Sequence, residues 1–571
     1  MNSIYLVFFA FFCFFCGYKY YSKYISKHIF NLDNNNKTPS HTHRDDVDYI
    51  PTNKHILFGH HFTSIAGAAP IIGPCIAVFW GWLPALIWVV IGTVFMGAVH
   101  DFGALTVSLK EKGRSIADIT SKVINKRTRI MFLCFVMCLT WLVLAVFAMA
   151  IAKLFTLYPS SVLPVNIEII IALIIGYLIY KKKLNSFIPS VLALIILYVS
   201  IYLGTLYPIS LDGISTFKWF NFEVWVELSQ SEALSLWIIL LFIYSSIASL
   251  LPVWLLLQPR DYINSHQLIV GLSLIYASIL IFRPEITAPA LNLSSGGPPI
   301  IPFLFVTIAC GAISGFHGLV SSGTTSKQIN KESDARLIGY GSMLGEGSLA
   351  LATIIASVAG IALVTNCEVN GIFHEHLAWN NYYDTWEHAA NNKFMAFVLG
   401  GGALLEKLGL SVEISRTLIS VLIISFAATT LDTATRIQRM IITELGAATN
   451  ISPLKNKIFA TILGVIPAYL LTLNGTGWQL WPVFGASNQM LAALTLMVLS
   501  IYFWKKGKNI LPLLIPMIFI MIITIISLFI KTNEFFTTGN YLLLTINILL
   551  ISLIIWMIIE GSLQVKNKVF K

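Results

Sequence analysis

The sequence predicts an all-α polytopic membrane protein with about 15 transmembrane helices. Of its 571 residues, 56% are hydrophobic and 11% are charged, against roughly 25% charged in an ordinary soluble domain. Lys and Arg gather in short clusters between the apolar runs, as the positive-inside rule requires. This distribution excludes a soluble enzyme. It also argues against nucleic acid as a partner, because no basic face carries interleaved aromatic residues.

The apolar runs give the predicted spans in order along the chain. They lie at 3–17, 60–80, 82–109, 130–157, 166–180, 187–208, 234–257, 267–283, 301–325, 336–364, 412–431, 458–473, 480–504, 510–530 and 541–560. A further apolar stretch of 12 residues at 394–405 contains three consecutive glycines and ends at a charged pair. It is too short to cross, so we expect a re-entrant or interfacial segment over 394–408. The N-terminal run lacks the basic start and cleavage site of a signal peptide, and we expect an uncleaved span.

The basic residues predict how the spans are oriented. With the N-terminus outside and 15 alternating spans, 30 of the 37 Lys and Arg residues fall on the inner face. Counting 394–405 as a crossing would place the last basic loops outside, so the charges favour leaving it out. The sequence therefore predicts a multi-pass protein of the bacterial inner membrane, with its N-terminus outside and its C-terminus in the cytoplasm.

A short motif occurs twice inside predicted spans, as TSIAGAAP at 63–70 and SSIASLLP at 245–252, with four of eight positions identical. Proline and hydroxyl residues within a span leave backbone groups that only protein or a cavity can satisfy. The two copies run in opposite directions across the membrane. They therefore predict a five-plus-five inverted repeat, with two broken helices around a substrate site.

The repeat divides the chain into four parts. Residues 1–55 form an N-terminal span and a cytoplasmic loop, and 56–208 form the first five-helix repeat. Residues 234–435 form the second repeat with its re-entrant segment, and 457–571 form four C-terminal spans and a short cytoplasmic tail. One span therefore precedes the core and four follow it.

The candidate substrate-binding residues lie in the two copies of the motif. An unwound turn offers carbonyls to a cation, and the half-helix that follows offers amides to an anion. The simpler alternative is a pair of kinked packing helices. The candidates are Thr63, Ser64, Gly67 and Pro70 in the first copy and Ser245, Ser246 and Ser249 in the second.

Ionisable residues inside the spans are candidates for ion or proton coupling, because charge at membrane depth is costly. Glu346, deep in its span between two glycines, is the clearest case. His317 is either a titrating group or a neutral imidazole that bonds between helices. The pair His100-Asp101 either relays protons or caps a helix at the inner interface.

Two charged or His-containing groups lie at the ends of the spans. Asp432 and Arg436 are separated by one helical turn, which predicts either an ion pair at an inner gate or simple interface charge. The histidines of His374-Glu375-His376 and His388 have a spacing too weak to predict a metal site. We expect no metal and no cofactor. No phosphate-binding loop and no nucleophile–base pattern occur, so neither ATP-driven transport nor an enzyme is predicted.

A series of motifs runs in order along roughly residues 40–500. They are GHHF at 59–62, IAG at 65–67, Pro70, GP at 73–74, GAVHDF at 97–102, SGFH at 314–317, SGT at 322–324, KQ at 327–328, IGYGSML at 338–344, LDTATR at 431–436 and FGASNQMLAAL at 484–494. Together they resemble the carbon starvation protein (CstA) family. The resemblance implies a bacterial inner-membrane importer induced when carbon is scarce. Its members are described as peptide transporters or proton-driven pyruvate transporters, with a LeuT-type fold.

The resemblance also suggests a role for two hydroxyl residues. In LeuT-type transporters, hydroxyls on the helix that corresponds to 301–325 meet the unwound turn and hold a cation. This gives Ser322 and Thr324 a coupling role, unless they only bond between helices.

The sequence therefore predicts a secondary transporter that imports a small organic nutrient, either a pyruvate-like carboxylate or a short peptide. We also predict that it works by symport with H⁺ or Na⁺ and that it acts in the response to carbon starvation. One alternative is a membrane nutrient sensor or receptor, which should carry a sizeable cytoplasmic domain that the short inner loops do not provide. A passive channel is the other. Membrane lipid is the remaining expected partner.

Overall fold

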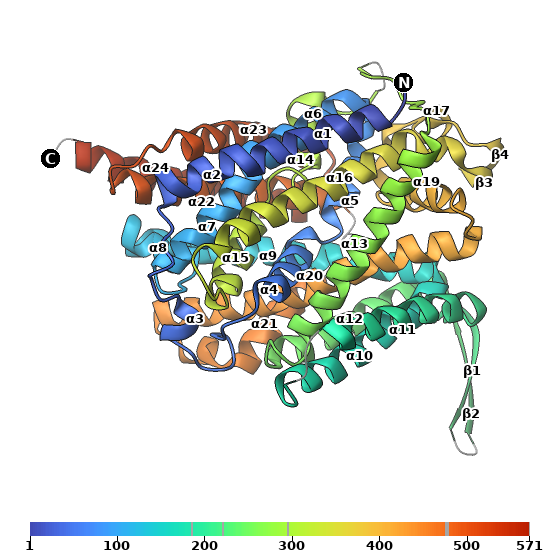
Figure 1. Cartoon of the computed structure of the whole chain (residues 1–571), viewed down its shortest axis with the longest axis horizontal. Helices are drawn as coiled ribbons and strands as arrows, with labels where there is room; N and C mark the ends of the chain where they lie inside the picture. Colours follow the sequence, from blue (N-terminus) through green and yellow to red (C-terminus); the bar gives the residue numbers. More distant parts are fainter. Residues whose placement is uncertain (184–186, 220–221, 294–295, 370, 474–478, 570–571) are drawn as a thin grey trace.

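A computed structural model describes residues 1–183, 187–219, 222–293, 296–369, 371–473 and 479–569, and this part of the chain is almost entirely helical (Figure 1). Twelve described helices are long and apolar enough to cross a membrane, or up to 13 if a bent pair counts as one span. The predicted count of about 15 is not confirmed. The region 301–325 is divided into two short helices, and the helix within 458–473 has only 14 residues. Lys571, counted at the inner face, lies outside the described residues.

The two ends of the helical bundle differ. The N-terminus and two antiparallel hairpins lie at the right end in Figure 1, called here the hairpin face. The hairpins are formed by β1 (Gly213–Trp219) with β2 (Phe222–Leu228) and by β3 (Thr365–Val369) with β4 (Ile372–His376). The short helix α8 (Ile116–Val123) and the last helix, α24 (Tyr541–Val569), lie toward the opposite end, the α8 face.

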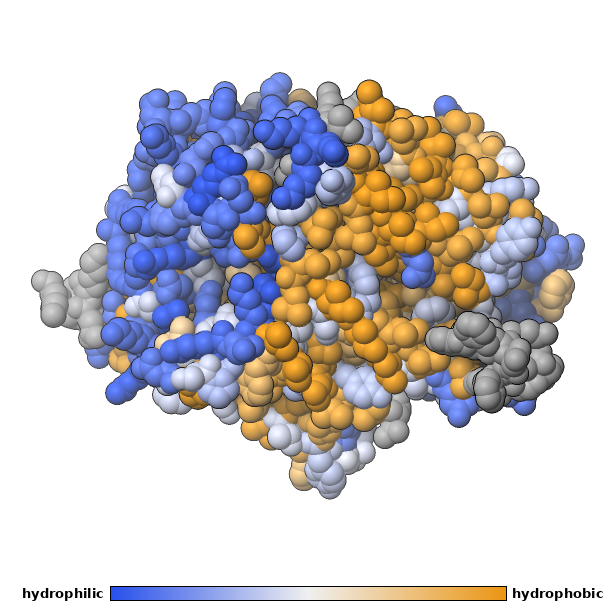
Figure 2. All heavy atoms as spheres, turned by 90° about the horizontal axis from the view of Figure 1, so that it is seen from below, coloured by the Kyte–Doolittle hydropathy of each residue, from blue (hydrophilic) through white to orange (hydrophobic). Residues whose placement is uncertain are grey.

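A wide apolar surface covers the molecule between these ends (Figure 2). Large apolar side chains on the outermost helices are exposed, and Phe8, Ile195, Ile243 and Ile515 are examples. So much exposed apolar surface is stable against lipid and not against water. The chain is a multi-pass membrane protein.

The first broken span consists of α4 (Lys54–Ala66) and α5 (Ala69–Ala77). The Asn53 side chain caps α4 by accepting from the His55 amide. Gly67 ends the helix with φ 27° and ψ −165°, a conformation that residues with a Cβ rarely adopt. Pro70 lies in the first turn of α5, where its missing N–H costs no helical hydrogen bond. The two segments are bent by 43°.

A second broken span consists of α14 (Ile300–Thr307) and α15 (Gly315–Gly323), separated by residues 308–314. The freed carbonyls of Ile308 and Gly311 accept hydrogen bonds from Trp88 Nε1 and Thr93 Oγ1, both at 3.0 Å. The two broken spans are in close contact, because a Cβ added at Gly73 would lie 2.5 Å from the Thr307 carbonyl oxygen. Figure 1 shows α5 and α14 nearer the hairpin face than α4 and α15.

The second interruption is therefore not where the repeated motif placed it. α12 (Gln230–Leu250) is continuous through the serines of the second motif copy, and the chain leaves helix only at Leu251. Pro252 follows the end of the helix, where a proline does not disrupt helical hydrogen bonds. α13 (Leu257–Phe282) then begins after a short turn.

Two long helices pack along each other in the core. They are α9 (Lys126–Leu157), with 32 residues, and α20 (Val412–Thr449), with 38. α19 (Met395–Glu406) has 12 residues and precedes α20; a re-entrant path for it stays a prediction. The other described α-helices are α1 (Ile4–Cys16), α2 (Ser22–Ile25), α3 (Pro39–Thr42), α6 (Trp82–Gly92), α7 (Ala98–Lys110), α10 (Val162–Tyr180), α11 (Phe187–Leu206), α16 (Ser342–Val358), α17 (Trp379–Tyr382), α18 (Trp386–Asn391), α21 (Lys457–Leu470), α22 (Trp481–Trp504), α23 (Leu511–Thr537) and α24 (Tyr541–Val569).

Candidate functional site

A buried polar group lies just before the break between α4 and α5. The Asp261 carboxylate of α13 contacts Nδ1 of His60 and accepts from Ser64 Oγ at 3.2 Å. Thr63 Oγ1 lies 3.3 Å from the backbone carbonyl oxygen of Asp261, and Ser64 Oγ lies 3.5 Å from Thr433 Oγ1 of α20. All five residues are buried. The last turn of α4 is thus attached to two other helices where its own helical bonds end.

Several buried polar atoms around this break have no hydrogen-bond partner among the described residues. They include Thr430 Oγ1 and the Nε2 atoms of His60 and His61. Thr430 Oγ1 would lie 2.8 Å from a Cβ added at Gly67, so it directly faces the break. Buried polar groups are normally paired with protein, water or ligand. The first motif copy therefore presents unpaired donors and acceptors that a polar ligand or water would satisfy.

A second buried group joins four titratable side chains in a row. His100 Nδ1 lies 2.8 Å from Asp101 Oδ1, and the other oxygen of Asp101 lies 2.9 Å from Nδ1 of His317. His317 Nε2 lies 3.3 Å from Glu346 Oε2. The four come from α7, α15 and α16, and all are fully buried. His100, Asp101 and His317 are hydrogen-bonded in turn, whereas His317 Nε2 and the Glu346 oxygens are close but have no hydrogen-bond partner among the described residues. Such a row can hold a proton at membrane depth.

The helix α4 belongs to the first group and also contacts the segment that follows α15. His60 faces Asp261 of α13, whereas the next residue, His61, bonds through Nδ1 to Thr325 Oγ1 at 2.9 Å. Thr325 follows α15 directly, and α15 carries His317. A movement of α4 would therefore change contacts toward both groups.

A third buried group, which the sequence interpretation missed, is centred on Arg260 of α13. Its guanidinium bonds to Glu168 of α10 at 2.9 Å and to Asp432 of α20 at 2.5 Å. The Tyr244 hydroxyl of α12 donates to Asp432 at 2.8 Å, and Ser425 donates to Glu168 at 2.6 Å. This cluster holds four helices together.

The predicted ion pair between Asp432 and Arg436 is corrected by this arrangement. Asp432 bonds to Arg260, while Arg436 bonds to Asp48 at 2.7 Å and to the Leu251 carbonyl oxygen at 2.8 Å. One turn of helix separates the two residues, but their side chains find partners on other elements. A gating role for either residue stays a prediction.

The other predicted site residues mostly bond within their own helices. Ser245 and Ser246 donate to the Phe242 carbonyl oxygen, and Ser249 donates to that of Ser246. Ser322 and Thr324 likewise donate to carbonyls four residues earlier, at 2.7 and 3.0 Å. Ser322 Oγ also accepts from the Ile116 amide of α8 at 3.2 Å, and the substrate and coupling roles of these five residues stay predictions. Within the same part of the chain, no group of three or more His, Cys, Asp or Glu side chains is placed to hold a metal ion.

Glu168, Arg260 and Asp261 are the main omissions from the sequence interpretation. Glu168 falls inside the predicted span 166–180, so the rule that selected Glu346 would also have selected it. Arg260 and Asp261 follow the predicted span 234–257 and were assigned to a loop. An arginine beside an aspartate, directly after Pro259, is the signal that the sequence carries.

A family model described as carbon starvation protein CstA matches residues 2–527. The chain belongs to this family. It is 32% identical over 589 residues to the pyruvate/proton symporter BtsT of Escherichia coli K12, covering 90% of this chain and 79% of that protein. It is also 31% identical over 573 residues to the peptide transporter CstA of Helicobacter pylori strain J99, covering 92% and 82%.

Likeness to solved structures is weaker. A manganese transporter of Eremococcus coleocola, in complex with an aromatic bis-isothiourea compound, aligns over 91% of this chain and 99% of its own. The TM-score is 0.46 and the identity 13%, values too low to support a conclusion from that structure.

Proposed function

We propose that this member of the CstA family is a secondary transporter of the inner membrane that imports a small carboxylate-bearing nutrient together with protons. Relatives about 30% identical are named for peptides and for pyruvate with protons. The observation that carries the proposal is the broken span α4/α5, where buried polar atoms have no hydrogen-bond partner among the described residues. The same span contacts, through His61, the segment that follows α15, and α15 carries His317 of the row of titratable groups.

The substrate is proposed to bind at the break. The N-terminal end of α5 favours a carboxylate through the helix dipole. Thr430 Oγ1 and His60 Nε2 are additional polar groups that such a substrate would satisfy. The hydroxyl of Ser64 and the Asp261 carboxylate would then fix the position of α4 relative to the bound molecule.

Proton coupling is proposed for the row from His100 to Glu346. A proton held there changes the charge between α7, α15 and α16. His61 of the broken span bonds to Thr325, which follows α15, and so connects the break to this row. We retain the five-plus-five inverted repeat in this proposal, with 56–208 and 234–435 as its halves, although the second motif copy lies in a helix that is continuous to Leu250. In this proposal the hairpin face lies outside the cell and the α8 face lies in the cytoplasm. We also propose a role in the response to carbon starvation, because the family is named for it.

Uptake into proteoliposomes tests the function. Labelled pyruvate and labelled dialanine are supplied separately under an inward H⁺ gradient or an inward Na⁺ gradient. We expect accumulation of at least one substrate under the H⁺ gradient and its collapse with a protonophore. Accumulation only under the Na⁺ gradient would overturn the coupling assignment. Simple equilibration under both gradients would indicate a channel, and no uptake of either substrate would overturn the transport proposal.

A further inference from the structure

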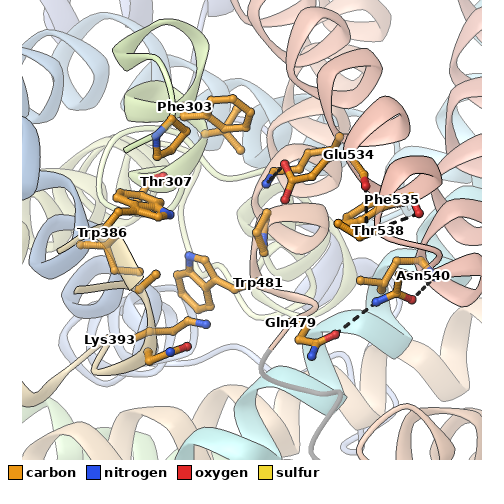
Figure 3. Close-up of a pocket in the computed structure, with 18 residues that line it drawn as sticks. Phe303, Thr307, Trp386, Lys393, Gln479, Trp481, Glu534, Phe535, Thr538 and Asn540 are labelled. Carbon is orange, nitrogen blue, oxygen red and sulfur yellow. Dashed lines mark hydrogen bonds and ion pairs between the residues drawn. The ribbon is translucent and has the colours of Figure 1, made fainter. Parts of the chain in front are cut away.

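A cavity of about 690 Å³ is lined by residues other than those of the groups described above (Figure 3). Its inner wall includes Ile76 of α5 and Thr307 of α14, so it reaches the half-helices of both broken spans. Its outer walls come from α18, from the start of α22 and from the end of α23. The size lies within the 300–1,000 Å³ that is typical of ligand sites. The cavity is therefore placed to receive a solute before it reaches the break.

Charged side chains lie on opposite walls of the cavity (Figure 3). Lys393 is only 5% exposed, and its Nζ lies 6.0 Å from the centroid of the Trp481 ring. On the other wall, Lys531 Nζ bonds to Glu534 at 2.6 Å and lies 5.1 Å from the centroid of the Phe303 ring. These three are the charged residues among those that line the cavity. Two cations and one carboxylate favour an anionic solute.

The Trp481 side chain provides a second polar contact beside Lys393. Trp481 is 6% exposed, and its indole Nε1 has no hydrogen-bond partner among the described residues. Figure 3 places its ring between Trp386 and Lys393, facing the cavity. A buried indole N–H normally has an acceptor. An oxygen atom of a bound molecule would satisfy it.

We propose that this cavity is a first recognition site for small organic carboxylates, in which Lys393 and the Trp481 indole N–H bind the carboxylate. The substrate class rests on the proposed function, whereas the site itself rests on the cavity. A carboxylate accepts from an ammonium and from an indole N–H, and low exposure strengthens the contact with the ammonium. Amide groups of Asn391, Gln479 and Asn540 on the same walls would suit the backbone of a peptide.

The protonation of Lys393 makes the site testable by pH. Burial lowers the pKa of Lys393 to about 7. Lys531 and Glu534 face it across the cavity, and His388 of α18 bonds through its ring to Asn392 at 3.2 Å. Only the protonated ammonium attracts a carboxylate, so affinity should fall as pH rises through about 7. Burial also lowers the pKa of His388, so His388 titrates on the acid side of this window.

The test measures initial uptake by the full-length protein in proteoliposomes, with labelled pyruvate in one arm and labelled trialanine in the other. For Lys393→Gln we expect KM to rise about tenfold while kcat stays within about twofold, because the site collects substrate and does not move it. Lys393→Arg should keep a low KM and remove its rise between pH 6 and pH 8.5, since arginine stays charged. Trp481→Phe should raise KM about threefold, because it removes the N–H while keeping a smaller aromatic ring at this position. Lys331→Gln, an exposed lysine outside the cavity, is the matched control.

The outcomes separate this inference from the proposed function. If wild-type protein transports but Lys393→Gln and Trp481→Phe keep its KM, the cavity is not a recognition site and the proposed function stands. If wild-type protein transports neither substrate, the proposed function fails, and equilibrium binding of each substrate to wild-type and Lys393→Gln protein decides the cavity. Equal binding by the two proteins would overturn the inference. A change in the pyruvate arm alone assigns the site to monocarboxylates, and a change in the trialanine arm alone assigns it to peptides.

Discussion

His317 Nε2 lies 3.3 Å from Glu346 Oε2, while Nδ1 of the same ring lies 2.9 Å from Asp101 Oδ2. One imidazole thus connects two carboxylates from different helices in a fully buried position. Because the ring can hold a proton on either nitrogen, its protonation decides how strongly α15 is attracted to α7 and α16. This gives a buried group through which a proton can affect helix positions.

Replacing Glu346 by Gln should separate coupling from substrate movement. The amide keeps the shape of the carboxyl group but cannot take up a proton. We expect accumulation driven by an H⁺ gradient to fall at least about tenfold, while exchange of internal for external substrate stays within about threefold. Both are measured in proteoliposomes. Glu375→Gln, an exposed change on β4, is the control, and wild-type accumulation by Glu346→Gln would disprove the coupling role.

Replacing Arg260 by Met should destabilise the protein. The change leaves Glu168 and Asp432 buried without their cation, and breaking a buried pair in this way costs about 3–5 kcal/mol. The free energy of unfolding in detergent measures the effect. Adding Glu168→Gln to Arg260→Met should restore part of the loss, because one unpaired charge is removed.

A control separates this effect from a general effect of losing a positive charge. Lys331 is exposed, so Lys331→Met should change the free energy of unfolding by less than about 0.5 kcal/mol. Equal stability of Arg260→Met and Lys331→Met would show that the cluster around Arg260 does not hold the helices together.

Much of the fold could be predicted because lipid imposes strict rules. Long apolar runs must be helices, and the first broken span followed from Gly67 and Pro70, whose backbone restrictions act locally. Glu346 and His317 were selected by the cost of burying polar groups, and the structure brings them together. Such single-residue rules need no knowledge of neighbouring helices.

The remaining features depend on contacts between distant helices. The SSIASLLP sequence at 245–252 resembles the first motif, yet its helix is continuous to Leu250, and the serine hydroxyls are satisfied within it. The actual second interruption at 308–314 contains no proline, and its carbonyls are satisfied by Trp88 and Thr93 of another span. Similarly, Asp432 has Arg260 as partner and not the nearby Arg436. Sequence spacing cannot reveal these choices.

Replacing Gly67 by Ala should impair transport. Gly67 has φ 27°, and the added Cβ would lie 2.8 Å from Thr430 Oγ1 and 3.1 Å from the Phe147 ring. We expect the rate of uptake to fall about tenfold, because the break would have to move away from α20 and α9. Gly539→Ala is the matched control: it also has positive φ, 69°, but no atom within 4 Å of the new Cβ. It should cost about 1–2 kcal/mol of stability without loss of uptake.

The ion pair between Asp48 and Arg436 predicts a loss of stability in acid. Burial raises the pKa of Asp48, but the charges of Arg436 and its basic neighbours outweigh burial and hold this pKa below the ordinary 3.8. The stabilisation is therefore complete above pH 3.8 and is lost as pH falls through the lower folded-state value. Asp48→Asn should lower the unfolding temperature at pH 7 and reduce its further fall on acidification. Asp46→Asn, which removes an exposed partner of Arg44, should do neither. Identical pH profiles for Asp48→Asn and wild type would show that this pair does not stabilise the contact between the 43–53 loop and α20.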